Sequence, residues 1–414
     1  MKKLIIFCCF ILFIPYYLCA QIHVTPRFLA PYIENAPLIG SRAAVLIDAH
    51  TGALLYSKNP DDEIPQASLT KLMTMHLLMK AIEEGRASYD ELVPITTESW
   101  AQSQPAGSSL MFLEPGQIVT LREILLGLSV SSGNDAAVAA ALHLAPSMLA
   151  FSNLMTEEAR RMGLHVTRFT EASGISEFNL TTAAEFALFC RQYVREHPHS
   201  LKEFHSVLSF SYPLAANVTQ AMRSRLSTIT QENQNSLLRT FSGVDGLKTG
   251  FINESGYNIA LTAQRNDTRF VLVILGAPNN TSGRRIRTDD SERLLAWAFN
   301  NFKTVRPDIN HIEKICKGAA QLWKGKEENV DLKINMSVDF TAPLNRANPL
   351  IYEVKITDTL IAPLPAGYQA GFLVISDEEG ELIRAPLVTV TDYEKGNFFK
   401  RLWHSIVLFF KNLY

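Results

Sequence analysis

The chain has 414 residues, of which 47% are hydrophobic and 19% are charged, and 39 Lys+Arg against 41 Asp+Glu give a net charge of −2. This composition fits a globular protein of two or three domains and excludes a disordered chain. No long basic block is present, so no nucleic-acid partner is expected. Three of the 5 cysteines lie within the first 20 residues, so neither a disulfide framework nor a cysteine-based zinc site is expected.

The first 20 residues have the pattern of a secretory signal peptide. Two lysines precede an apolar run, and Ala20 offers a small residue for cleavage. The run is interrupted by Pro15 and is shorter than the roughly 20 apolar residues of a permanent transmembrane anchor. A lipoprotein site at Cys19 would favour a small residue before it, and Leu18 is not one. We therefore expect cleavage after Ala20 and a mature protein that works outside the cytoplasm.

Helical and strand patterns alternate between residues 43 and 305. A hairpin is expected over 43–57, with its turn at residues 50–52, and a helix over 68–84. Further helices are expected near 121–129, 134–144, 147–162 and 181–196. Strands are expected at 244–249, 257–264 and 269–276, with a turn at 265–268, before a closing helix around 294–302. This order predicts an α+β fold in which helices flank an antiparallel sheet.

The predicted secondary structure changes after residue 305. Short β-like runs at 331–338, 352–356 and 371–376, with a turn at 377–380, predict a small all-β module. No other stretch of 18 or more apolar residues follows the leader, and no internal repeat is visible. The sequence therefore predicts four parts, with these bounds: a leader at 1–20, a larger α+β domain at 21–306, a small β-rich domain at 307–394 and a C-terminal helix at 395–414.

The last 20 residues differ from everything before them. On a helical wheel one half is apolar and rich in aromatics, the other half is polar, and Leu408 alone falls on the wrong side. The segment has four basic residues and no acidic one, which is typical of a helix lying in a membrane interface. The alternative is a C-terminal helix docked on its own domain. The number of large aromatic residues favours the membrane surface.

Three short motifs occur in order: Ser68-Leu69-Thr70-Lys71, Ser132-Gly133-Asn134 and Lys248-Thr249-Gly250. Ser68 opens a helix, so Lys71 lies on the same face with its Cβ about 5–6 Å away, and its amine can reach the serine hydroxyl. Alone, each motif also has a plainer interpretation. Ser68 can be a helix cap, Ser132-Gly133-Asn134 an ordinary turn, and the third motif a simple strand exit.

Together with their flanks, the motifs resemble those of the D-alanyl-D-alanine carboxypeptidases, low-molecular-weight penicillin-binding proteins with the β-lactamase/transpeptidase-like fold. Four stretches carry the resemblance: 44–56, 64–74, 107–113 through 132–136, and 244–250 through 256–258. The small β domain and the amphipathic tail extend it, because family members typically carry both. The resemblance implies that the enzyme removes the terminal D-alanine from peptidoglycan pentapeptides ending in D-Ala-D-Ala, without a metal or cofactor. It also implies inhibition by β-lactams.

The resemblance implies roles for nine residues. Ser68 would be the nucleophile, Lys71 its base, Ser132 a proton relay and Asn134 an orienting group. Burial and the nearby charge of Lys248 would favour a neutral Lys71. The remaining residues are expected to bind substrate. They are Lys248, Thr249, Gly250, Phe251, whose N–H would complete an oxyanion hole with that of Ser68, and Arg287.

Some positions depart from the family pattern. Phe251 stands where many relatives have histidine, so the backbone N–H is kept but a polar side chain is lost. The loop at 171–175 lacks the Asn-Pro pair usual before its glycine, and Glu185 stands where aspartate is common. Arg284 competes with Arg287 for the role of assisting arginine. These departures bear on substrate preference.

Three alternatives to the carboxypeptidase remain to be weighed. A class A β-lactamase would need a glutamate in a Glu-x-x-Leu-Asn context, and no such segment occurs. A D,D-endopeptidase or transpeptidase would use the same residues with a different amine. A non-catalytic cell-wall-binding protein is disfavoured because every motif residue is intact. The expected location is the outer face of the cytoplasmic membrane, facing the periplasm, with peripheral attachment through residues 395–414.

Overall fold

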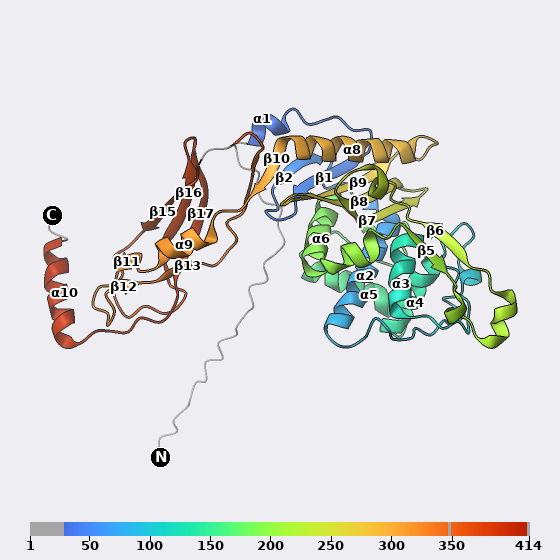
Figure 1. The fold of residues 1–414 in the computed structure, drawn as a ribbon, viewed down its shortest axis with the longest axis horizontal. Helices are drawn as coiled ribbons and strands as arrows, with labels where there is room; N and C mark the ends of the chain where they lie inside the picture. The colour runs from blue at the N-terminus through green and yellow to red at the C-terminus, as the bar shows by residue number, and fades with distance from the viewer. Residues whose placement is uncertain (1–28, 347–348, 412–414) are drawn as a thin grey trace, which may run out of the picture.

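A five-stranded antiparallel sheet, in the order β2-β1-β9-β8-β7, organises the larger part of the molecule (Figure 1). The computed structural model describes residues 29–346 and 349–411, so the predicted signal peptide lies outside the described residues. The strands of this sheet are β1 (Ala43–Asp48), β2 (Leu54–Lys58), β7 (Val244–Ile252), β8 (Gly256–Arg265) and β9 (Thr268–Ala277). All neighbouring strands pair antiparallel. The predicted fold class is confirmed.

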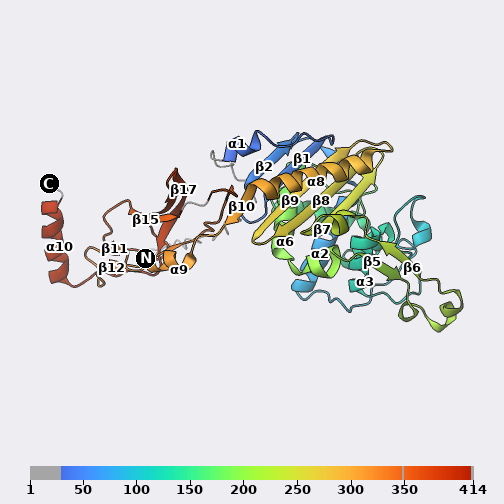
Figure 2. The same ribbon diagram turned by 45° about the horizontal axis from the view of Figure 1, so that its top comes forward.

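Helices cover both faces of this sheet (Figure 2). Val45 and Ile47 of β1 pack into the core under α2 and α6, whereas Ala44 and Leu46 pack into the core under α8. Side chains alternate between the two faces of a strand, so a strand covered on both sides must be apolar throughout, as β1 is. The helices of this part are α1 (Ala30–Ile33), α2 (Lys71–Glu83), α3 (Leu121–Leu126), α4 (Asn134–Leu144), α5 (Met148–Arg161), α6 (Ala183–Glu196), α7 (Leu237–Thr240) and α8 (Gly283–Asn301).

The elements expected in this part are present, with shifted ends. In the predicted first hairpin, Gly52 takes a φ of 76° and its N–H donates to the Asp48 carbonyl. The helix expected from Ser68 begins as a 3₁₀ turn, Ala67–Thr70, and becomes α-helical at Lys71. The helix expected over 121–129 changes after α3 into a π-helical turn, Gly127–Ser131.

Two pairs of short strands in this part were not predicted. One is β3 (Ile64–Pro65) with β4 (Leu180–Thr181), and the other is the pair β5 (Ser209–Tyr212) and β6 (Ile229–Glu232). The second pair consists of strands of 4 residues each, and although Phe210 and Tyr212 alternate with serines in β5, β6 is polar after Ile229, so the pattern is too short to identify a hairpin in the sequence.

The smaller part contains the expected sheet, in the order β13-β17-β16-β15, around its own hydrophobic cluster. Its predicted turn at 377–380 is confirmed by the pairing of Asp377 with Gly380. A helix that was not predicted, α9 (Ile309–Cys316), begins at Asp308, whose carboxylate accepts from two N–H groups of the first turn. The strands are β10 (Phe302–Val305), β11 (Ala320–Gln321), β12 (Asn329–Val330), β13 (Leu332–Ile334), β14 (Phe340–Pro343), β15 (Ile351–Ile356), β16 (Gln369–Asp377) and β17 (Gly380–Thr389).

The two parts are joined at a buried carboxylate. Asp48, at the end of β1, accepts hydrogen bonds from the hydroxyls of Thr304 and Thr341, at 2.8 and 3.0 Å. The last helix, α10 (Phe398–Lys411), lies at the end of the molecule away from the five-stranded sheet (Figure 1). Among the described residues no single helix has the length and apolarity to cross a membrane; α4 and α5 meet that test only as a pair, bent by 86°.

Candidate active site

The first motif places a lysine amine beside a serine hydroxyl. Ser68 lies in the 3₁₀ turn, Lys71 is the first residue of α2, and Lys71 Nζ is 3.1 Å from Ser68 Oγ. Ala67, just before Ser68, has a φ of 52°, in the left-handed region that non-glycine residues rarely adopt. The predicted contact between the two side chains is therefore present, at the end of a strained turn.

The Lys71 amine is fully buried and has two further partners. It donates to Asn134 Oδ1 over 2.8 Å and to the Ser173 carbonyl over 2.5 Å. A neutral amine has two N–H bonds and one lone pair, so these two acceptors leave the lone pair for the hydroxyl hydrogen of Ser68. The arrangement suits an amine that takes a proton from Ser68.

Burial is what makes that neutral form accessible. It lowers the pKa of Lys71 to about 8, although the negative charges of Glu171 and Asp135 act in the opposite direction. A lysine with this pKa is partly deprotonated near neutral pH, which an ordinary surface lysine is not.

The second motif turns between two helices. Ser132, with φ 56° and ψ 31°, ends the π-helical turn, and Asn134 begins α4. Asn134 holds Lys71 with its oxygen and donates to Ser108 Oγ with its amide nitrogen over 3.2 Å. Asp135 accepts from the N–H groups of Met111 and Leu113, which ties the 107–113 segment to the motif. The predicted interhelical turn thus presents Ser132 and Asn134 to the same space.

The third motif lies on β7, against the nucleophile turn. A Cβ added to Gly250 would lie 3.0 Å from Ser68 N and 3.1 Å from the Gln66 carbonyl, so a side chain here would require the nucleophile turn to move by a few tenths of an ångström. Lys248 and Thr249 are both buried beside it. The motif therefore forms the wall opposite Lys71, as predicted.

Two buried cations stand at this wall. Burial first, and then the charges of Lys71 and Arg287, hold the pKa of Lys248 well below its ordinary value. Burial also lowers the pKa of Arg287 to about 10, and its Nε has no hydrogen-bond partner among the described residues. Burial is the largest cause of the lowered pKa of Lys71, and the repulsion between the two amines acts on both, which agrees with the expectation that a nearby Lys248 favours a neutral Lys71.

The motifs border one cavity of about 500 Å³. Arg287 reaches it from the buried side of α8, and Arg284, the competitor, reaches it from an exposed position. Phe251 is 42% exposed at the rim, with its ring 4.4 Å from that of Tyr257, so it offers an apolar surface there. Residues of the cavity wall include Ser68, Ser108, Ser132, Asn134, Gly174, Thr249, Gly250, Phe251, Tyr257, Arg284 and Arg287.

Comparison with known proteins identifies the family. A family profile described as D-alanyl-D-alanine carboxypeptidase matches residues 31–279. The chain belongs to this family. A second profile, described as the C-terminal domain of penicillin-binding protein 5, matches residues 313–395. Relatives include the D-alanyl-D-alanine carboxypeptidases DacC and DacD of Escherichia coli K12, 30% and 33% identical; the matches cover 92% and 90% of this chain and 92% of each relative.

Solved structures agree with this assignment. Penicillin-binding protein 5 from Haemophilus influenzae superposes with a TM-score of 0.75 at 28% identity, over 87% of this chain and 99% of that one. Penicillin-binding protein D2 from Listeria monocytogenes, in the ampicillin bound form, gives 0.53 at 26% identity, over 63% and 98%. The predicted enzyme class, a serine-type D-Ala-D-Ala carboxypeptidase, is confirmed at the level of the family.

The carboxypeptidase site also contains groups that the sequence did not reveal. Ser173 contacts Lys71 through its backbone carbonyl, which any residue could supply. Glu171 organises the loop, because its carboxylate accepts from Ser173 N, Ser173 Oγ and Gly174 N at 2.6–2.7 Å. The only sign of this role in the sequence is the position of Glu171, two residues before Ser173 and three before Gly174. That spacing indicates hydrogen bonds to the loop only once the loop conformation is known.

Gly174 offers a test of how closely this loop approaches the nucleophile. It has a φ of 85°, and an added Cβ would lie 1.8 Å from the Ala67 carbonyl oxygen and 2.9 Å from Ser68 N. We expect Gly174→Ala to lower the free energy of unfolding by more than the ~1–3 kcal/mol of the backbone strain and to slow labelling by fluorescent penicillin. Denaturant unfolding and labelling rates measure the two effects.

The matched control is Gly85→Ala. Gly85 has a φ of 70° with nothing within 4 Å of the added Cβ, so it carries the same backbone strain without the collision. It should lose only the strain energy and label at the wild-type rate. An equal decrease in the free energy of unfolding for both variants would show that the close approach of Gly174 to the nucleophile turn does not affect stability.

Proposed function

We propose that Ser68 is the acyl-accepting residue of this carboxypeptidase and that Lys71 is its base. Ser68 Oγ attacks the carbonyl carbon of the D-Ala-D-Ala bond while Lys71 Nζ takes the hydroxyl proton. The C–N bond then breaks, D-alanine leaves with a proton relayed by Ser132, and water hydrolyses the acyl-enzyme. The observation that carries this assignment is the buried Lys71 amine, whose two other partners leave its lone pair for Ser68.

The terminal carboxylate of the peptide would bind at the opposite wall. Lys248 and Arg287 are buried cations, and burying positive charge without a counter-ion is costly. A carboxylate between them would be stabilised by both, and the Thr249 hydroxyl can donate to it. The acid group of a β-lactam would occupy the same place, so one cavity would accept both ligands.

Hydrolysis of a terminal residue is favoured over the alternatives. DacC, DacD and DacA of Escherichia coli K12, which are 30–33% identical and cover at least nine tenths of this chain, are named carboxypeptidases. A D-alanyl-D-alanine endopeptidase from Pseudomonas aeruginosa is 29% identical over only 65% of the chain. A non-catalytic binding role is disfavoured because Ser68 and Lys71 are in contact.

The acyl-enzyme is tested by intact mass. Wild-type protein treated with penicillin should gain one adduct and should remove one D-alanine from a muropeptide ending in D-Ala-D-Ala, and Ser68→Ala should lose both properties. Ser131→Ala is the matched control, since Ser131 is buried and its hydroxyl has no partner among the described residues. An adduct that persists in Ser68→Ala would refute the assignment. Release from cross-linked dimers instead of pentapeptides would favour an endopeptidase.

The role of Lys71 as base predicts a pH dependence. Its folded-state pKa of about 8 means that the neutral, active form increases as pH rises through 8. The second-order rate constant of acylation should therefore rise about tenfold per unit below pH 7 and level off above pH 9. Lys71→Arg keeps the charge but cannot lose its proton, so it should be as slow as Lys71→Ala. A wild-type rate that does not change from pH 6 to 9, or a fast Lys71→Arg, would contradict this role.

We also propose that α10 holds the enzyme on the outer face of the cytoplasmic membrane, after secretion directed by residues 1–20. Support comes from the two sides of the helix. One side contacts the small β part: His404 Nδ1 accepts from Lys324 N over 2.8 Å, Leu408 is buried, and Lys411 lies over the Trp323 ring. The other side carries apolar side chains that are 44–79% exposed: Phe398, Phe399, Leu402, Trp403, Ile406, Phe409 and Phe410.

The geometry of α10 favours lying flat over spanning. Its 14 residues extend about 21 Å, less than the ~30 Å hydrocarbon core. Each of its charged residues would cost about 2.5–3.5 kcal/mol at the membrane centre. In the interface, the aromatic side chains enter the headgroup boundary while the basic residues meet anionic lipids.

Vesicle sedimentation tests the surface attachment. Protein with Phe399→Glu and Phe410→Glu should no longer sediment with phosphatidylglycerol vesicles, whereas Leu149→Glu, at a 70% exposed leucine of α5, should bind as wild type does. A chain ending at Glu394 should be released into the soluble periplasmic fraction with its activity on short peptides intact. If that chain still sediments with cell membranes, an uncleaved leader provides the anchor instead.

A further inference from the structure

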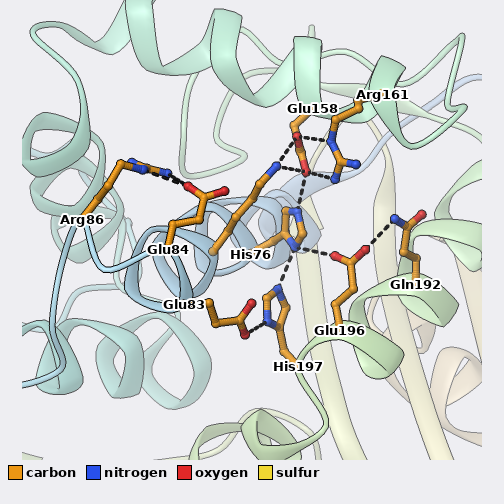
Figure 3. Close-up of polar contacts among 10 residues, drawn as sticks. His76, Glu83, Glu84, Arg86, Glu158, Arg161, Gln192, Glu196 and His197 are labelled. Atoms are coloured by element: carbon orange, nitrogen blue, oxygen red, sulfur yellow. Dashed lines mark hydrogen bonds and ion pairs between the residues drawn. The ribbon is translucent and has the colours of Figure 1, made fainter. Parts of the chain in front are cut away.

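Two histidines face each other inside the larger domain, away from the cavity (Figure 3). His76 lies on α2, five residues after Lys71, and His197 directly follows α6. Both side chains are buried, with exposed fractions of 0% and 1%. His76 Nδ1 and His197 Nε2 are 2.9 Å apart.

The outer nitrogen of each ring is bonded to a carboxylate. His76 Nε2 is 2.8 Å from Glu158, and His197 Nδ1 is 2.7 Å from Glu83. Glu158 also accepts from Lys80 and Arg161, so it is held as an ionised acceptor. An ionised carboxylate only accepts hydrogen bonds, so each outer ring nitrogen carries the hydrogen.

This hydrogen-bond pattern leaves the two inner nitrogens with lone pairs pointing at each other. Two lone pairs at 2.9 Å repel unless a positive centre lies between them. Glu196 adds a third donor atom, because its Oε2 is 3.8 Å from His76 Nδ1 while its Oε1 is fixed by Gln192 Nε2 at 2.7 Å. The three ligand atoms, one from each residue, lie within 4.8 Å of one another (Figure 3).

We propose that His76, His197 and Glu196 form a binding site for a divalent transition-metal ion, with Zn²⁺ the best match. Zinc binds imidazole nitrogen at about 2.0–2.1 Å and carboxylate oxygen at about 2.0–2.2 Å, so tetrahedral ligand atoms are about 3.3 Å apart. The observed separations of 2.9 and 3.8 Å bracket that value, and the third, between His197 and Glu196, is at most 4.8 Å, so the Glu196 carboxylate would move toward the two rings when an ion binds. Two imidazoles and one carboxylate leave a fourth position for water.

The surroundings match those of metal-binding histidines. Such histidines usually donate their second nitrogen to a carboxylate, which fixes the ring and the tautomer, and here Glu158 and Glu83 both do this. Glu196 is exposed, so an ion can enter from its side. The sequence predicts no metal, since one histidine stands 120 residues before a Glu-His pair and no ligand spacing is visible.

A bound ion would connect the end of α6 to the helix that begins with Lys71. None of its three ligands borders the cavity, so the ion has a structural role and the site is independent of the proposed acylation chemistry. The alternative is that a single proton, and not a metal ion, lies between His76 Nδ1 and His197 Nε2. A proton and a metal ion differ in their response to chelators and to added zinc.

The test uses the purified full chain, stripped with a chelator and titrated with ZnCl₂. We expect one zinc per chain by mass spectrometry of the metal, and a melting temperature that rises on addition of zinc. Cobalt added in its place should give the visible absorption of a four-coordinate site. Glu196→Gln should weaken zinc binding at least tenfold, and His76→Gln or His197→Gln should abolish it.

Exposed variants keep the test decisive if the buried ones fail to fold. Glu83→Gln keeps the hydrogen bond but removes the charge behind His197, and it should weaken binding 10- to 100-fold. His143→Gln, which removes a histidine paired with Glu91, should bind zinc as wild type does. No zinc bound and an unchanged melting temperature, or equal binding by wild type, Glu196→Gln and Glu83→Gln, would overturn the proposal. Penicillin labelling at the wild-type rate in Glu196→Gln would show that the acylating site is intact in either case.

Discussion

The burial of one amine constrains the rest of the catalytic domain. Lys71 Nζ meets Ser68, Asn134 and the Ser173 carbonyl, which come from three segments far apart in the sequence. A buried amine must have hydrogen-bond partners, and desolvation lowers its pKa only if water stays out. The sheet, α2 and α4 therefore have to hold these segments together whether or not substrate is present. The chemistry depends on this packing more than on any single motif residue.

Close backbone approach is the second constraint, and it follows from the first. Gly174 and Gly250 both lie against the nucleophile turn, and a Cβ on either one would meet the backbone of residues 66–68 at 3.1 Å or less. Side chains at these positions would separate the walls and let water reach Lys71. Asp135 adds to the enclosure, because it fixes the 107–113 segment through two backbone N–H groups. The left-handed φ of Ala67 is maintained by this enclosure.

Side chains with a fixed spacing were predictable from the sequence, and backbone groups were not. The three motifs located Ser68, Lys71, Asn134 and the β7 wall, because helix and strand periodicity fixes which residues share a face. The contact of the Ser173 carbonyl with Lys71 could not be predicted, because every residue has a backbone carbonyl and the residue type does not show which one is used. The β5–β6 pair was missed because its strands are short and β6 is polar after its first residue. The pairing of His76 with His197 depends on where α2 and α6 cross, which is a property of packing alone.

Leu408 shows that a helical wheel can predict an amphipathic helix correctly without revealing that the helix also contacts the protein on its other side. The wheel treats one apolar face as meeting one environment, and Leu408 falls outside it. In the structure this residue is 9% exposed on the side of α10 that contacts the small β part, four residues after His404. Because that side is occupied, the aromatic side is fixed facing away from the protein. Under the proposed attachment, the small β part then stands between the membrane and the larger domain (Figure 1). Its dimensions would set how far from the lipid surface a pentapeptide must extend to reach Ser68.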